Sequence, residues 1–109
     1  MGKLSIYKDE PKPDLTILRI SGEFQGISAL MAKQETMGAL KERNSGTVLI
    51  DLAEVHYIDS AALGLLLELS QLAAKNHLSF GLIHVDGPVK KLIQATKLDK
   101  IINIRDDQK

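Results

Sequence analysis

The sequence predicts an α/β fold: an open, mixed and mostly parallel sheet of four to five strands with about three to four helices. Short apolar segments rich in β-branched residues alternate with longer segments of helical periodicity, a pattern typical of parallel strands joined by helical crossovers. The apolar run at residues 48–52 is nearly continuous, which favours a strand covered on both faces. A length of 109 residues fits one domain, taken as residues 1–109.

The first two strands are expected at residues 4–7 and 15–20. Residues 4–7 alternate apolar and polar side chains. Pro11 and Pro13 then favour a turn or a sheet edge. Residues 15–20 are apolar and β-rich, and Ser21-Gly22 follows them. We expect these two strands to pair antiparallel at one side of the sheet.

A first helix is expected over residues 28–43, with Ser28 as its N-cap. Leu30, Met37 and Leu40 fall near one stripe of this helix and are expected to face the core. The strand at residues 48–52 follows. A second helix is expected at residues 60–76 and another buried strand at residues 78–85. Asp86-Gly87-Pro88 is expected to open a third helix. Residues 101–104 form either a last short strand or a tail against the sheet.

The composition argues against several classes of function. Fourteen basic residues balance fourteen acidic ones, so the chain lacks an overall field that would attract nucleic acid. It contains no cysteine, which excludes disulfides and thiolate chemistry and fits a cytoplasmic location. The longest apolar stretch, residues 61–67, is interrupted by Gly64 and is too short to span a membrane. We therefore expect neither a nucleic-acid partner nor a membrane partner.

The segment Asp59-Ser60 places a hydroxyl at the start of a helix, beyond the carboxyl end of a buried strand. Binding sites gather at this edge of open α/β sheets. One interpretation is structural: Asp59 or Ser60 caps the free amides of the first helical turn. The other is regulatory, because a phosphate on Ser60 would suit the positive end of the helix. A docked partner with a close apolar or acidic contact would tolerate that phosphate less well.

The same stretch resembles the STAS domain family, and most closely its bacterial anti-sigma factor antagonists. Residues 58–64, Ile-Asp-Ser-Ala-Ala-Leu-Gly, resemble the phosphorylation motif Asp-Ser-Ser-Gly-Leu-Gly. Residues 21–24, Ser-Gly-Glu-Phe, resemble the signature Gly-Glu-Leu-Asp at the end of a strand. Residues 89–93, 97–99 and 101–102 resemble the closing helix and tail of the family.

The resemblance implies a phosphorylation-switched binding protein rather than an enzyme, with no cofactor and Ser60 as the phosphate acceptor. Its partner would be a serine kinase that is also an anti-sigma factor. The unphosphorylated protein binds this kinase and frees the sigma factor, phosphorylation releases the kinase, and a phosphatase of the PP2C type resets the switch. The expected partner-binding residues lie around the acceptor: Glu23, Gln25, His56, Asp59, Ser60, Ala61, Leu63 and Gly64. One or two leucines of residues 63–69 are expected to be exposed beside Ser60 as an apolar contact.

The departures from the family motifs keep a second hypothesis open. Phe24 and Gln25 replace Leu and Asp of one signature, and Ala61 and Ala62 replace Ser-Gly of the other. The alternative is a STAS subunit of a lipid-transport assembly or of a stress-signalling scaffold, which also acts by protein binding. A third hypothesis is a small enzyme that uses Ser60 as a nucleophile. It is weaker, because the Gly-x-Ser-x-Gly elbow is absent. The spacing of the three histidines suggests no metal site.

Overall fold

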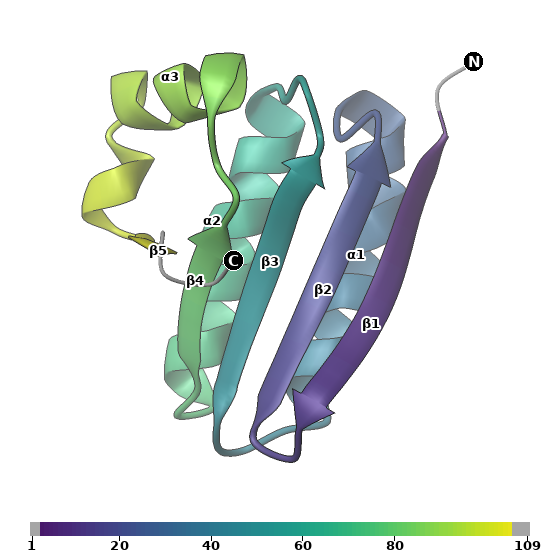
Figure 1. The fold of residues 1–109 in the computed structure, drawn as a ribbon, viewed down its shortest axis with the longest axis vertical. Coiled ribbons are helices and arrows are strands. Elements are labelled where there is room, and N and C mark those ends of the chain that lie inside the picture. The colour runs from purple at the N-terminus through teal and green to yellow at the C-terminus, as the bar shows by residue number, and fades with distance from the viewer. Residues whose placement is uncertain (1–2, 106–109) are drawn as a thin grey trace.

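Within residues 3–105, which the computed structural model describes, five strands form one sheet in the order β1-β2-β3-β4-β5 (Figure 1). β1 pairs antiparallel with β2, and β2 to β5 run parallel. The strands are β1 (Leu4–Lys12), β2 (Leu15–Gly22), β3 (Thr47–Glu54), β4 (Ser79–Ile83) and β5 (Asn103–Arg105). The helices are α1 (Gly26–Lys41), α2 (Ser60–Lys75), α3 (Gly87–Ala95) and the 3-10 turn η1 (Leu98–Lys100). The predicted fold class is confirmed.

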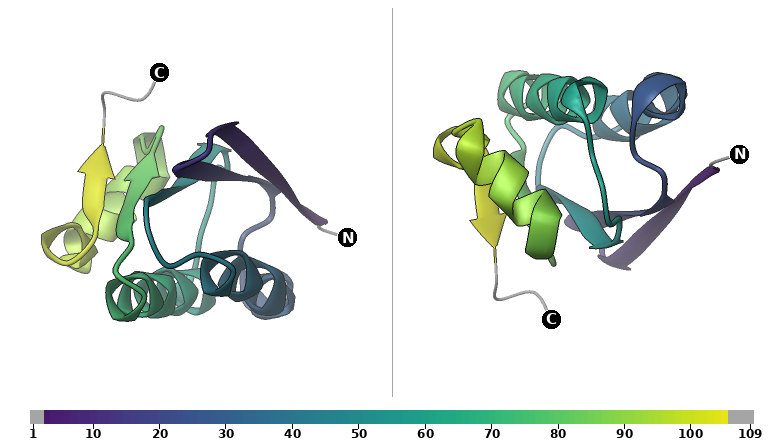
Figure 2. Two further views of the ribbon diagram at one scale, coloured as in Figure 1. Left: turned by 90° about the horizontal axis from the view of Figure 1, so that it is seen from below. Right: turned by 90° about the horizontal axis from the view of Figure 1, so that it is seen from above.

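The two long helices, α1 and α2, pack on one face of the sheet, and α3 lies beyond the end of β4 (Figure 1 and Figure 2). Figure 2 shows α1 and α2 side by side against that face. Val48, Ile50 and Leu52 of β3 point into the core that these helices cover. Residues 48–52 are buried on both faces of the sheet, as predicted, but α1 and α2 cover only one of those faces.

The opposite face of the sheet buries its apolar side chains without a helix. Ile17, Leu49 and Ile83 form a small cluster there, on three neighbouring strands. The aliphatic carbons of Arg105 lie directly against Gly81 on the same face. Long arginine stems can cover apolar surface in this way. The continuous apolar run in β3 thus reflects one helix-covered core and one smaller cluster among strand neighbours.

The two elements before the site differ in extent from the prediction. β1 continues to Lys12 through Pro11, with a register shift between Asp9 and Lys12. A proline is tolerated there because β1 is an edge strand. α1 begins at Gly26 with Gln25 as its N-cap, so the assignment of Ser28 as the cap is wrong.

The predicted core stripe of α1 is only partly correct. Leu40 is buried, but Leu30 is 64% exposed and Met37 only half-buried. The buried face of α1 consists of smaller side chains, Ala29, Ala32 and Thr36, together with Leu40. Thr36 satisfies its buried hydroxyl by donating to the carbonyl oxygen of Ala32 at 2.9 Å. Leu30 is therefore available on the outer surface of the helix.

The second half of the chain follows the prediction more closely. α2 begins at Ser60 as expected, and Pro88 lies in the first turn of α3. β4 ends at Ile83, two residues early, since His84 adopts a φ of +58° that leaves the strand conformation. The tail forms a true strand, β5, parallel to β4, although it starts at Asn103 rather than at residue 101. None of the helices within residues 3–105 has the length and apolar character needed to cross a membrane.

Candidate functional site

Ser60 is the first residue of α2 and is exposed. The residue before it, Asp59, has extended backbone dihedrals and is the N-cap of the helix. Its Oδ1 atom accepts a hydrogen bond from the amide of Ala62 at 3.1 Å. Of the two candidate caps in the sequence, Asp59 therefore fills the role with its carboxylate, and Ser60 lies at the next position with its side chain in the exposed first turn.

Two loops that are distant in sequence meet at Asp59. Its second oxygen, Oδ2, accepts a hydrogen bond from the amide of Gly26 at 2.9 Å. A parallel bridge between Phe24 and Ile58 joins the same loops one step earlier. Because β2 and β3 run parallel and adjacent, their following loops emerge at the same edge of the sheet. The β2–α1 loop, with Glu23 and Gln25, is thus held against the loop that leads into α2 at Ser60.

Asp59 serves the amino ends of two helices at once. It bonds the third amide of α2 and the first amide of α1. The amino ends of helices carry partial positive charge, so a carboxylate is stabilised between them. α1 gains from this contact in particular, because Gln25 makes no side-chain capping bond and the first turn of α1 contains no acidic residue.

A group of large apolar side chains is exposed on the first turns of α1. Ile27, Leu30 and Met31 are 74%, 64% and 75% exposed, and their i, i+3, i+4 spacing places them on one face. We call these three residues the α1 patch. Sequence reasoning missed it by assigning Leu30 to the core. The available signal was that apolar side chains surround the helix at residues 27–32, which leaves no clear buried stripe.

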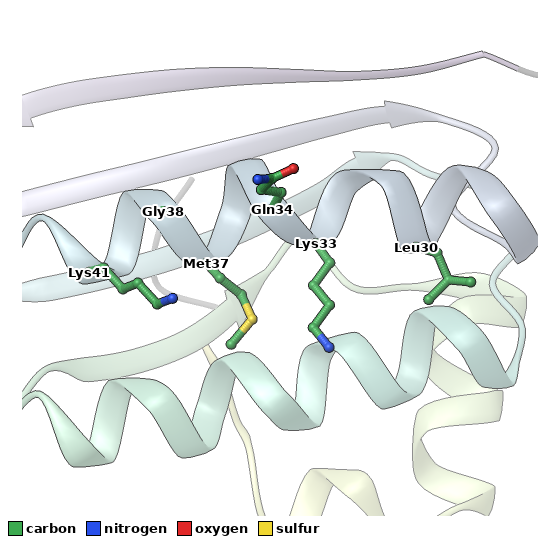
Figure 3. A pocket seen from close by; sticks show the side chains of 6 residues that line it. All are labelled: Leu30, Lys33, Gln34, Met37, Gly38 and Lys41. Carbon is green, nitrogen blue, oxygen red and sulfur yellow. The ribbon is translucent and has the colours of Figure 1, made fainter.

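The α1 patch continues into a shallow groove along α1. A cavity of about 450 Å³ is lined by Leu30, Lys33, Gln34, Met37, Gly38 and Lys41. Figure 3 shows Leu30, Lys33 and Met37 reaching from α1 toward α2. The ammonium of Lys33 lies 3.1 Å from the carboxylate of Glu68 on α2 and links the two helices across the groove.

The outer face of α2 beside Ser60 carries small residues. Ala61 is half-buried, Gly64 is exposed, and a Cβ added to Gly64 would meet nothing within 4 Å. Leu63 and Leu67 are half-buried, and the other leucines of residues 63–69 lie in the core. The leucines expected to be exposed beside Ser60 are thus no more than half-exposed, and the large exposed apolar side chains near this edge of the sheet lie on α1 instead.

The remaining predicted residues border the same edge of the sheet. Glu23 and His56 are exposed, and Gln25 is half-buried at the start of α1. Tyr57, which sequence reasoning did not consider, follows His56 and is 58% exposed. No group of three acidic or histidine side chains within residues 3–105 is placed to hold a metal ion.

A separate charged cluster occupies the open face of the sheet. Asp51 is buried and accepts hydrogen bonds from Arg19 at 2.5 Å and from the amide of Ala53 at 2.9 Å. Nδ1 of His84 lies 2.8 Å from the Oδ1 atom of Asp51. Arg19 also pairs with Asp9, at 3.0 Å. Burial acts to raise the pKa of Asp51, but the bonds from Ala53, His84 and Arg19 outweigh it and hold the pKa below its usual value.

This arrangement defines a small α/β domain with one helical layer and an exposed serine at the carboxyl edge of its sheet. The sequence model of the STAS domain matches residues 8–109, and the chain belongs to the STAS domain family. The predicted family is confirmed.

Known relatives agree with this assignment. The anti-sigma F factor antagonist of Paenibacillus polymyxa is 26% identical over 92 residues, which is 84% of this chain and 79% of that protein. An anti-sigma factor antagonist from Mycobacterium paratuberculosis has a similar structure, with a TM-score of 0.85, 20% identity and coverage of 97% of this chain and 88% of that chain.

A third relative, the anti-sigma factor antagonist SpoIIAA, known from Bacillus, has been solved in two forms. The unphosphorylated form gives a TM-score of 0.78 at 14% identity and covers 95% of this chain and 90% of that one. The phosphorylated form gives 0.70 at 13% identity and covers 95% and 94%. At such identities the solved structures establish a common fold.

Proposed function

We propose that this protein is an anti-sigma factor antagonist whose binding to a serine kinase is switched off by phosphorylation of Ser60. The observation that carries the proposal is the exposed hydroxyl at the start of α2, beside the exposed α1 patch. Family membership and relatives named as anti-sigma factor antagonists support it. The proposed partners are an anti-sigma factor that is also a serine kinase, and a phosphatase of the PP2C type.

The proposed chemistry is carried out by the kinase. The Oγ atom of Ser60 attacks the γ-phosphorus of ATP, the bond from that phosphorus to the ADP oxygen breaks, and the hydroxyl proton passes to a base of the kinase. The phosphatase later hydrolyses the phosphoester with water and restores the serine. This protein supplies the hydroxyl and the surface that positions it. An exposed first-turn serine suits this role, because a phosphate of about −1.5 to −2 charge is tolerated at a helix amino end.

The kinase is also the proposed occupant of the α1 patch. A kinase that reaches Ser60 must cover the surface around it, and the Asp59–Gly26 contact holds the beginning of α1 at that place. Apolar side chains at the centre of an interface contribute much of its affinity. The proposed partner-binding set accordingly gains Ile27, Leu30 and Met31. They join the predicted residues of the two loops and of the start of α2: Glu23, Gln25, His56, Asp59, Ser60, Ala61, Leu63 and Gly64.

The decisive experiment compares wild type, Ser60→Ala and Ser60→Asp as baits in the native cell. Wild type and Ser60→Ala are expected to retain a kinase, and Ser60→Asp to lose it. The retained kinase is then incubated with ATP and each protein, and mass spectrometry locates the phosphate. Phosphate is expected on Ser60 of the wild type and absent from Ser60→Ala.

Two results would redirect the proposal. Phosphate only at other residues would contradict the assignment of Ser60. Recovery of a transporter ATPase or a large multi-STAS assembly, with no kinase, would favour the alternative of a subunit in a transport or stress-signalling assembly. The changes at Phe24, Gln25, Ala61 and Ala62 relative to the two family motifs are the reason to include these outcomes.

A further inference from the structure

Asp59 is shared between the phosphoacceptor helix and α1. Its Oδ1 atom bonds the amide of Ala62 at 3.1 Å, and its Oδ2 atom bonds the amide of Gly26 at 2.9 Å. A single carboxylate therefore joins the amino ends of α1 and α2. Any group that moves this carboxylate acts on both helices.

The start of α1 has little local support of its own. Its N-cap, Gln25, makes no side-chain capping bond, and no acidic residue lies in its first turn. Gly26, the first residue of the helix, has a φ of +54° and costs conformational entropy to fix. The contact from Asp59 is thus a main stabilising interaction for this turn, which leads directly into the α1 patch.

A phosphate on Ser60 would compete with Asp59 for the same place. It would add about −1.5 to −2 charge on the residue next to the carboxylate, so the two groups would repel each other. It would also offer strong acceptor oxygens to the first-turn amides of α2, of which Ala62 is now bonded by Asp59. The stronger acceptor displaces the weaker one when both face the same donors.

We propose that Asp59 is the positioning residue through which phosphorylation of Ser60 reaches α1. The phosphate displaces the Asp59 carboxylate from its amides, the amide of Gly26 loses its acceptor, and the first turn of α1 loosens. The α1 patch then loses the fixed geometry that a partner requires. This inference rests on the proposed function, since it takes Ser60 to be the phosphoacceptor, and it adds a route by which the phosphate acts beyond its own charge.

The test inserts phosphoserine at position 60 during translation, so it needs no kinase. NMR follows the hydrogen exchange of the Gly26 amide and the Cα shifts of residues 26–31. Phosphoserine at position 60 is expected to speed the exchange of Gly26 by about fivefold, as for the loss of one capping contact, and to move the Cα shifts of residues 26–31 away from helical values. Phosphoserine at the exposed Ser45 is the control and is expected to change neither readout.

Variants of Asp59 test whether the effect of the phosphate on α1 passes through this carboxylate. Asp59→Ser keeps a capping oxygen for α2, so the fold is retained, but it removes the second acceptor. We expect it to speed the exchange of Gly26 without any phosphate, and phosphoserine 60 to cause no further change in this background. Asp59→Glu, which keeps two acceptor oxygens, is expected to restore part of the response.

The inference is overturned if phosphoserine 60 leaves Gly26 and residues 26–31 unchanged. It is equally overturned if the phosphate has the same effect in Asp59→Ser as in the wild type, because the route would then bypass Asp59. Both outcomes are independent of the proposed function, which fails instead when no kinase of the native cell modifies Ser60.

Discussion

The Oδ1 atom of Asp51 lies 2.8 Å from Nδ1 of His84, and this contact joins the end of β4 to the middle of the sheet. Asp51 also bonds Arg19 of β2 through its other oxygen. A single buried carboxylate thus connects three neighbouring strands on the face that no helix covers within residues 3–105. The contact lies on the face opposite to the helices, so it supports the sheet rather than the proposed kinase surface.

This network predicts a pH-dependent stability. The pKa of Asp51 is held below its usual value, so its ionised form stabilises the fold above about pH 4, the pKa of an unfolded aspartate. That stabilisation is lost as the pH falls through the lower pKa of the folded state. Asp51→Asn is expected to reduce the free energy of unfolding by about 2 kcal/mol at pH 7, and the difference from wild type is expected to shrink below about pH 4.

Asp9→Asn is the matched control, because Asp9 pairs with the same arginine but is far more exposed. Its cost is expected to stay below about 1 kcal/mol. Urea denaturation between pH 3 and pH 7 measures both variants. Equal costs for the two variants, or a constant difference between Asp51→Asn and wild type over this range, would contradict the assignment.

Two glycines at the β2–α1 loop are predicted to differ in their tolerance of alanine. Gly22 has a φ of +106°, and a Cβ there would lie 2.0 Å from the carbonyl oxygen of Lys3. Gly26 has a φ of +54°, but an added Cβ meets nothing within 4 Å. Gly26→Ala is expected to cost about 1 kcal/mol from backbone strain alone. Gly22→Ala is expected to cost about 3 kcal/mol, because strain and a backbone clash combine.

Urea denaturation at pH 7 measures the glycine pair directly. The Gly26 amide remains in Gly26→Ala, so the contact with Asp59 is kept and only the strain is tested. A larger loss for Gly26→Ala than for Gly22→Ala would contradict the backbone clash assigned to a side chain at Gly22.

The sequence predicts the order of the elements because each strand and helix carries its own local pattern. It also predicts the start of α2, since the capping group, Asp59, is the adjacent residue. It fails at the start of α1, where the acceptor for Gly26 is again Asp59 but lies 33 residues further along the chain. A local search for a capping residue therefore selects Ser28, the nearest hydroxyl.

The same limit explains the other differences. A run of apolar residues such as 48–52 shows that both sides of a strand are buried, but not whether helices or neighbouring side chains bury them. Leu49 is buried by neighbouring side chains of the sheet, Ile17 and Ile83, and not by a helix. The α1 patch was missed for a related reason. A large apolar residue such as Leu30 is assigned to the core by default, whereas Leu40 is the only large side chain among the four buried residues of α1.

Gly64 and Gly38, which lie in helix interiors, offer a prediction about access to Ser60. Gly64 and Ser60 are one turn apart on α2, and an added Cβ at Gly64 meets nothing within 4 Å. Gly38 of α1 is equally unobstructed. Gly64→Ala and Gly38→Ala are each expected to stabilise the fold by about 1 kcal/mol, because alanine is the better helix former.

Arginine substitutions at the same two positions test whether the kinase reaches Ser60 over this part of α2, apart from any effect on the stability of the fold. Gly64→Arg is expected to slow phosphorylation of Ser60 by the cognate kinase on the order of tenfold, a loss of about 1.4 kcal/mol, since the bulky side chain projects beside the hydroxyl. Gly38→Arg is expected to leave the rate unchanged. Mass spectrometry of the phosphorylated peptide over time gives both rates, and an unaffected Gly64→Arg would mean that the kinase does not approach over this turn of α2.

The α1 patch carries the last prediction, on partner affinity. Met31 is 75% exposed, so Met31→Asp and Met31→Lys are expected to change the free energy of unfolding by no more than about 0.5 kcal/mol. Each is expected to weaken binding of the kinase about 30-fold, because a buried contact would be replaced by a charge that must lose its water. Using both signs of charge separates loss of the apolar contact from simple electrostatic attraction or repulsion.

Ile101→Asp is the control, since Ile101 is 62% exposed but follows η1, away from the α1 patch. If calorimetry finds wild-type affinity for both Met31 variants, the kinase does not cover α1, and the exposed apolar residues there require another explanation.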